Sequence, residues 1–74
     1  MRLNEDEKKF VTYLAERGGS AYLYEVRRAL SMPHTSAWRI ARRLQEMEII
    51  GSVKVKNGKR ELLRIFLKRK LRSR

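Results

Sequence analysis

The sequence contains no cysteine, and its only proline and only histidine are adjacent, at Pro33 and His34. Without thiols the chain can form neither a disulfide nor a thiolate metal site, and one histidine cannot build a zinc site alone. No apolar run approaches the roughly 20 residues that a membrane-spanning helix needs. The 74 residues suffice for one small domain, whose stability must come from a compact apolar core.

Acidic residues are scarce relative to basic ones. Lysine and arginine number 19 against 8 aspartates and glutamates, which gives a formal net charge of +11. In so short a chain this excess attracts polyanions, with nucleic acid as the first candidate and an anionic membrane surface as the second. Solubility alone rarely requires such an imbalance. The lack of cysteine is compatible with a cytoplasmic location, and 36% charged residues with few Asn and Gln are typical of a thermophilic source.

The first segment with helical apolar spacing covers about residues 5–17. Asn4 is a favourable N-cap, and Glu7 stands three residues later, as in a capping box. Gly18 can take the left-handed conformation that commonly ends a helix. These signals predict a helix with defined ends.

A second unit starts at Ser20, and its helix runs to about Leu30. Because proline suits the first turn of a helix, Pro33 then opens a third helix that extends to about Met47. At about 100° per residue, one face of this third helix is apolar and the other points to solvent. The apolar face comprises Ala37, Ile40, Ala41, Leu44 and Met47, and the opposite face carries Thr35, Arg39 and Arg42, with Trp38 and Arg43 at its margins.

Beyond Ile50 the apolar period changes from helical to alternating. Residues 51–56 predict a strand, and Asn57-Gly58 is a strong hairpin signal because both residues tolerate positive φ. The return strand is expected over 59–67, although the residues from Leu62 onward also fit a helical stripe. With Asn57 and Gly58 in the turn, the expected cross-strand pairs are Lys56 with Lys59 and Lys54 with Glu61.

The order helix, helix, short turn, helix, hairpin resembles the winged helix-turn-helix superfamily, above all small archaeal transcription regulators and the MarR-like group. Residues 23–30, LYEVRRAL, look like its first motif helix, and residues 36–44, SAWRIARRL, resemble its recognition helix. Ser31 and Glu48 stand where glycine is frequent in that family. The resemblance covers about residues 5–67. It implies a mainly α fold with a small β-hairpin (α+β), as one domain over 1–67 with a wing at 51–67, followed by a basic tail at 68–74.

In that family the third helix enters the DNA major groove and the wing follows the backbone or the minor groove. The resemblance therefore implies a sequence-specific double-stranded DNA-binding transcriptional regulator, cytoplasmic and nucleoid-associated, that needs no cofactor. Arginine can bind guanine O6 and N7 through two hydrogen bonds. The candidates for base contact are Arg39, Arg42, Thr35 and Trp38. The candidates for backbone contact are Ser36, His34, Arg43, Lys54, Lys56, Lys59 and Arg60.

Several alternatives stay open. Trp38 sits at the boundary of the apolar face, so packing against the hairpin or a partner competes with a nucleic-acid contact. A ribosome-associated RNA-binding protein would carry a similar charge, and a winged-helix adaptor in a protein assembly would use Trp38 as an anchor. Related regulators are commonly homodimers. Here the interface would comprise the first helix and the apolar residues of the C-terminal segment, Leu63, Phe66, Leu67 and Leu71.

Enzymatic activity is not expected. The sequence has no nucleophile paired with His34, no glycine-rich phosphate loop and no cluster of metal ligands. Glu46 and Glu48, two residues apart on a helix, point to different faces and make a poor carboxylate pair. Membrane binding by the basic tail is not favoured, because Leu71 is its only apolar residue.

Overall fold

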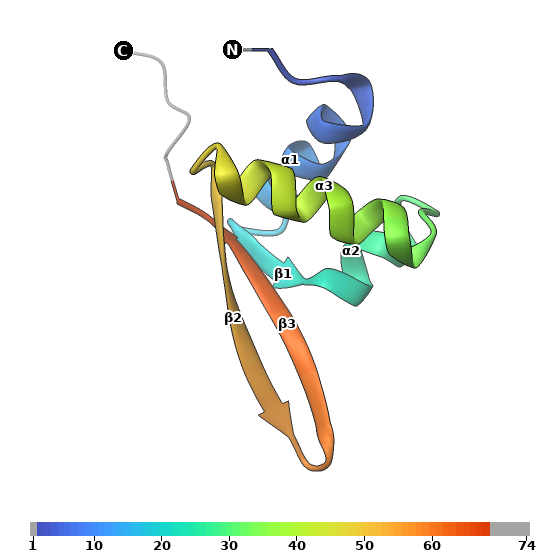
Figure 1. The fold of residues 1–74 in the computed structure, drawn as a ribbon, viewed down its shortest axis with the longest axis vertical. Helices are drawn as coiled ribbons and strands as arrows, with labels where there is room; N and C mark the ends of the chain where they lie inside the picture. Colours follow the sequence, from blue (N-terminus) through green and yellow to red (C-terminus); the bar gives the residue numbers. More distant parts are fainter. Residues whose placement is uncertain (1, 69–74) are drawn as a thin grey trace.

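Three helices and one three-stranded antiparallel sheet make up residues 2–68, the part of the protein that its computed structural model describes (Figure 1). The elements are α1 (Glu5–Glu16), β1 (Ser20–Tyr22), α2 (Leu23–Ala29), α3 (His34–Glu46), β2 (Ile50–Asn57) and β3 (Arg60–Leu67). The predicted α+β class is confirmed, and residues 60–67 form a strand rather than a helix. The predicted basic tail beyond Lys68, which includes Leu71, lies outside the described residues.

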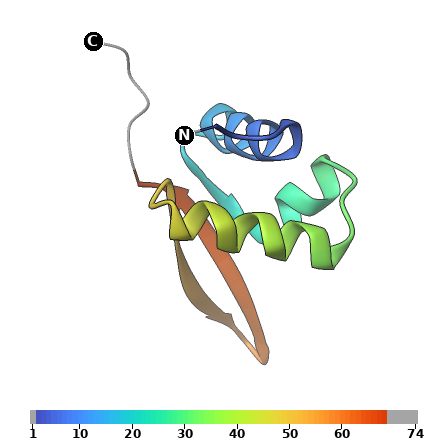
Figure 2. The same cartoon turned by 45° about the horizontal axis from the view of Figure 1, so that its top comes forward.

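The hairpin of β2 and β3 projects from the helices and gives the molecule its length of 43 Å, against 23 and 21 Å in the other directions. In Figures 1 and 2 the hairpin tip and α1 lie at opposite ends, with α3 between them. None of the helices within residues 2–68 is long and apolar enough to cross a membrane.

The core forms where the three helices meet the inner face of the sheet. Its fully buried apolar side chains are Phe10, Leu14, Val26, Ala37, Leu44, Ile50 and Ile65. On α3, Ala41 is buried as well and Ile40 is half-buried against the cluster, as is Met47 at the C-cap of the helix. The apolar face predicted for this helix is therefore the face that packs.

All three helices end in the same hydrogen-bonded motif, in which the residue after the C-cap is left-handed. The left-handed residues are Gly18 (φ +85°), Ser31 (φ +53°) and Glu48 (φ +62°). The backbone N–H groups that close the motif are those of Gly19 to Leu14 O (2.8 Å), Met32 to Arg27 O (2.9 Å) and Ile49 to Leu44 O (3.0 Å). The predicted role of Gly18 is confirmed. At the other two positions, where the resemblance leads one to expect glycine, the backbone takes the conformation that favours glycine.

Glu7 caps α1 and joins it to α3. Its backbone N–H donates to Asn4 Oδ1 (2.8 Å), and its Oε1 accepts the N–H of Asn4 (3.0 Å), so the predicted capping box is confirmed. Its Oε2 pairs with Arg43 Nε at 2.7 Å. The side chain is only 1% exposed. This single carboxylate therefore accepts a backbone hydrogen bond at the start of α1 and also holds α1 against α3.

The segment before α2 differs from the prediction. Residues 20–22, predicted to begin the second helical unit, form β1, which pairs with β3 in the register Ser20↔Phe66 and Tyr22↔Arg64. The helix starts only at Leu23, where Glu25 accepts a hydrogen bond from the N–H of Tyr22 (2.9 Å). A strand of three residues is too short to show alternation, and its pairing partner comes from the far end of the chain.

The hairpin forms where it was predicted but with a different turn. Asn57 pairs with Arg60, so the two turn residues are Gly58 and Lys59. Within the turn only Gly58 has a positive φ (+68°). This fits a type II′ turn, which places glycine at the first central position, whereas a type I′ turn needs positive φ at both positions.

The different turn changes the cross-strand pairs by two residues. Lys56 faces Glu61, and Lys54 faces Leu63. The predicted pairs of Lys56 with Lys59 and of Lys54 with Glu61 are therefore wrong. A shift of two residues leaves every side chain on its predicted face of the sheet. It also replaces an expected repulsion with an opposite-charge pair.

Glu48→Gly should stabilise the protein, because glycine adopts a positive φ without the steric cost that a Cβ imposes. We expect the free energy of unfolding to rise by roughly 0.5–1 kcal/mol, measured by thermal or urea denaturation. The control is Thr12→Gly on the exposed side of α1, which should instead lower it by roughly 0.3 kcal/mol, because threonine is already a weak helix former. Equal losses in the two variants would contradict the role given to Glu48.

Arg43→Ala should destabilise the protein by roughly 1–3 kcal/mol, because it leaves the carboxylate of Glu7 buried without its cationic partner. In a Glu7→Gln background the same change should cost much less, since the amide oxygen still accepts the capping hydrogen bond but carries no charge. Urea denaturation of the four proteins of this double-mutant cycle measures the coupling. If Arg43→Ala costs the same in both backgrounds, the ion pair does not stabilise the fold.

Candidate nucleic-acid interface

Charge is distributed unevenly along the long axis of the molecule. The basic residues of α3 are Arg39, Arg42 and Arg43, and those of the hairpin are Lys54, Lys56, Lys59, Arg60 and Arg64. Half of the acidic residues lie on α1, namely Glu5, Asp6, Glu7 and Glu16. Since α1 and the hairpin tip are at opposite ends (Figures 1 and 2), half of the acidic residues lie away from the basic residues of α3 and the hairpin.

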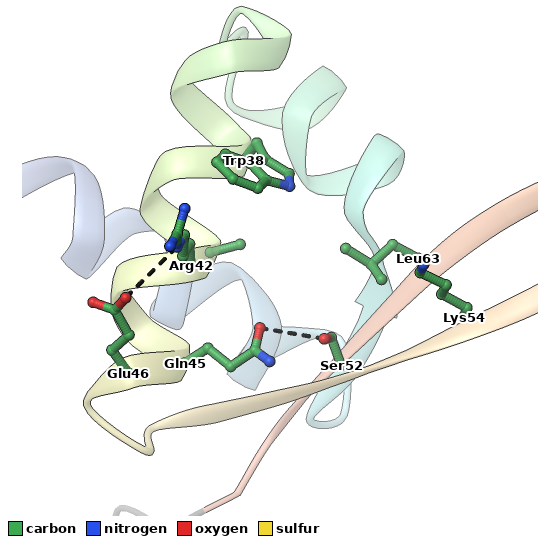
Figure 3. A pocket seen from close by; sticks show the side chains of 8 residues that line it. Trp38, Arg42, Gln45, Glu46, Ser52, Lys54 and Leu63 are labelled. Carbon is green, nitrogen blue, oxygen red and sulfur yellow. Dashed lines mark hydrogen bonds and ion pairs between the residues drawn. The ribbon is translucent and has the colours of Figure 1, made fainter.

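A cleft of about 520 Å³ separates α3 from the hairpin (Figure 3). Its charged and polar lining residues are Arg42, Gln45, Glu46, Ser52 and Lys54, and its other lining residues are Trp38, Ala41 and Leu63. At one end the hydroxyl of Ser52 donates to Gln45 Oε1 (3.2 Å), which connects β2 to the last turn of α3. The cleft brings together Arg42 and Lys54, two predicted contact residues from separate elements.

A second, smaller hollow continues this surface along α3. It measures about 300 Å³ and is lined by His34, Thr35, Trp38 and Arg39. Trp38 borders both hollows, so the two form one continuous surface. We define the α3–hairpin face by its predicted contact residues, which are His34, Thr35, Trp38, Arg39, Arg42 and Lys54.

Trp38 lies within this face and not in the core. Its side chain is 47% exposed, and the guanidinium carbon of Arg42 lies 5.4 Å from the centre of its ring. Such a cation–π contact orients both groups. The exposed part of the indole is therefore available to a ligand in the cleft.

Two of the α3 arginines form ion pairs with carboxylates, each through its Nε atom. Arg42 Nε lies 3.6 Å from Glu46 Oε2, one helical turn along, and Arg43 Nε lies 2.7 Å from Glu7 Oε2. Both side chains remain largely exposed. In each case the two terminal nitrogens of the guanidinium are left to donate to a ligand.

The remaining predicted contacts are dispersed. Lys56 lies on the same side of the hairpin as Lys54, because side chains two residues apart share a face, and Lys59 is in the turn. The pairing of Arg60 with Asn57 places Arg60 on the opposite side. Ser36 is half-buried in the first turn of α3. The structure therefore brings together part of the predicted backbone set and separates Arg60 from it.

Five residues that line the cleft were not predicted as site residues. They are Ala41, Gln45, Glu46, Ser52 and Leu63. The spacing of Glu46 from Arg42, four residues on the same helix, was a usable signal in the sequence. The other four enter the site only because the hairpin packs beside α3.

We compared the chain with protein-family models, with curated proteins and with solved structures, and none of them matches it.

Proposed function

We propose that this protein is a winged helix-turn-helix transcriptional regulator that binds double-stranded DNA with sequence preference. In this proposal α3 is the recognition helix and the β2–β3 hairpin is the wing. The observation that carries it is the cleft in which Arg42 of α3 and Lys54 of the hairpin line one surface. With such a helix in the major groove and a hairpin beside it, the intervening phosphate backbone passes on the Lys54 side of the cleft, and Arg42 on the α3 side reaches a base edge.

The dimensions of α3 suit this use. Its 13 residues span about 20 Å at about 1.5 Å per residue. A major groove about 12 Å wide accepts an α-helix with its side chains. Because the buried side of α3 faces the core, only its exposed side can enter the groove, and that side carries Arg39 and Arg42.

Roles follow from position on this surface. Arg39, Arg42, Thr35 and Trp38 face the groove and are the base-contact candidates. Lys54 and Lys56 on the side of the hairpin that faces α3, with Lys59 in the turn, are positioned for the backbone. His34 and Ser36, near the N-terminus of α3, complete the phosphate contacts. Arg43 contributes its two terminal nitrogens while its Nε stays paired with Glu7.

Selection of binding sequences from a random duplex library, followed by titrations of variants, tests the proposal. Arg39→Ala or Arg42→Ala should reduce the preference at one base position by roughly 1–3 kcal/mol. Lys56→Ala or Lys59→Ala should lower the affinity for all duplexes by a similar factor and lower the salt slope by about 1. For about six phosphate contacts, log affinity should fall with log salt at a slope near −5.

Three outcomes would contradict the proposal. The first is that no sequence is enriched by the selection, and the second is a salt slope near zero, which fits a protein-binding adaptor. The third is that structured RNA displaces duplex DNA at equal salt, which fits an RNA-binding protein. A two-fold symmetric enriched sequence, with half-sites about 34 Å apart, would additionally identify the DNA-bound form as a homodimer.

A further inference from the structure

Trp38, Arg42 and Glu46 form a stripe along α3 that borders the cleft (Figure 3). They are four residues apart and so lie one helical turn from each other. The guanidinium of Arg42 is flanked by the ring of Trp38 (5.4 Å) and by the carboxylate of Glu46 (3.6 Å). The orientation of Arg42 is therefore constrained by two neighbours on its own helix.

The guanidinium nitrogen that forms the ion pair with Glu46 determines what Arg42 can still bind. Glu46 is paired with Nε, which leaves both terminal nitrogens free. These two nitrogens form the fork that matches O6 and N7 of guanine. A guanine edge is uncharged, so it can accept this fork without repelling the carboxylate beside it. A phosphate carries a full negative charge and is repelled.

The repulsion acts at short range. A phosphate oxygen bound by Arg42 would lie about 2.9 Å from the guanidinium, which is itself 3.6 Å from Glu46. The phosphate and the carboxylate would therefore be separated by one guanidinium group, a distance on the order of the Debye length of about 8 Å at physiological salt, so ions screen their repulsion incompletely. The hydrogen bond from Ser52 to Gln45 connects β2 to the last turn of α3, and Glu46 on that turn lines the cleft.

We propose that Glu46 is a specificity-determining positioning residue, which directs Arg42 to an uncharged base edge and away from phosphate. This rests on the proposed DNA-binding function and adds to it a means of discrimination against non-specific DNA. Glu46 lowers the affinity for any duplex that offers Arg42 only phosphate. It leaves the affinity for a duplex that offers guanine at the matching position largely unchanged.

Glu46→Gln in the full chain tests this against a random-sequence duplex and the selected duplex. Freed from the carboxylate, Arg42 gains a phosphate contact on random DNA, so the salt slope should steepen by about 0.9. With equal binding of the two proteins at about 1 M salt, this slope change makes Glu46→Gln bind random DNA about eightfold more tightly than the unmodified protein at about 0.1 M salt. Affinity for the selected duplex should change by less than about twofold, so the ratio between the two affinities should fall about eightfold.

Glu48→Gln is the matched control, because it removes the same charge two residues away. Glu48 is exposed and does not line the cleft. We expect this variant to change both affinities by the same small factor and to leave their ratio intact. Thermal melting should show that both variants fold, since an exposed helical ion pair contributes little to stability.

Two results would overturn the assignment of Glu46. If Glu48→Gln lowers the ratio as much as Glu46→Gln does, the effect is one of bulk charge. If Glu46→Gln weakens the selected duplex and leaves random DNA unaffected, Glu46 itself contacts a base. In both cases the unmodified protein still prefers its selected duplex, and the proposed function stands. If it prefers no duplex, the proposed function and this inference both fail.

Discussion

The burial of Ala37, Ala41 and Leu44 fixes the rotation of α3 about its own axis, and the position of every candidate contact depends on that packing. Successive residues turn by about 100°, so once one side of the helix is buried the directions of all others are set. Arg39 and Arg42 face outward for this reason. The β2–β3 hairpin packs beside the same helix, and its lysines join the exposed side through the cleft that Arg42 and Lys54 share.

Two carboxylates pair with α3 arginines through the Nε atom and leave the terminal guanidinium nitrogens unpaired. Glu7 is buried and ties Arg43 to the start of α1, so the ion pair belongs to the architecture of the helices. Glu46 is exposed beside Arg42, and its ion pair contributes little to stability. An arginine–carboxylate ion pair therefore stabilises helix packing at Glu7 and, as we propose, controls ligand selection at Glu46. The two roles differ because Glu7 is buried and Glu46 is exposed.

Features that depend on neighbouring residues could be predicted from the sequence. The capping box at Asn4, the left-handed Gly18 and the exposed side of α3 all follow from local spacing. Strand β1 could not be predicted, because three residues carry no periodicity and the partner strand is distant in sequence. The turn was misassigned because glycine at Gly58 fits either of two hairpin turns. In the site, the arginines of α3 were predictable from periodicity. Most of the other residues that line the cleft are brought there by tertiary packing. Among them, only Glu46 could be linked to the site from the sequence, through its spacing from Arg42.

The central claim is that α3 and the hairpin bind a DNA duplex as one surface. It is tested most directly by following backbone amide resonances of the isotope-labelled protein while duplex is added. We predict that the perturbed amides cluster at residues 34–43 of α3 and 52–59 of the hairpin, with α1 unaffected beyond its first turn. Perturbations confined to α1, or restricted to either α3 or the hairpin alone, would contradict a shared surface.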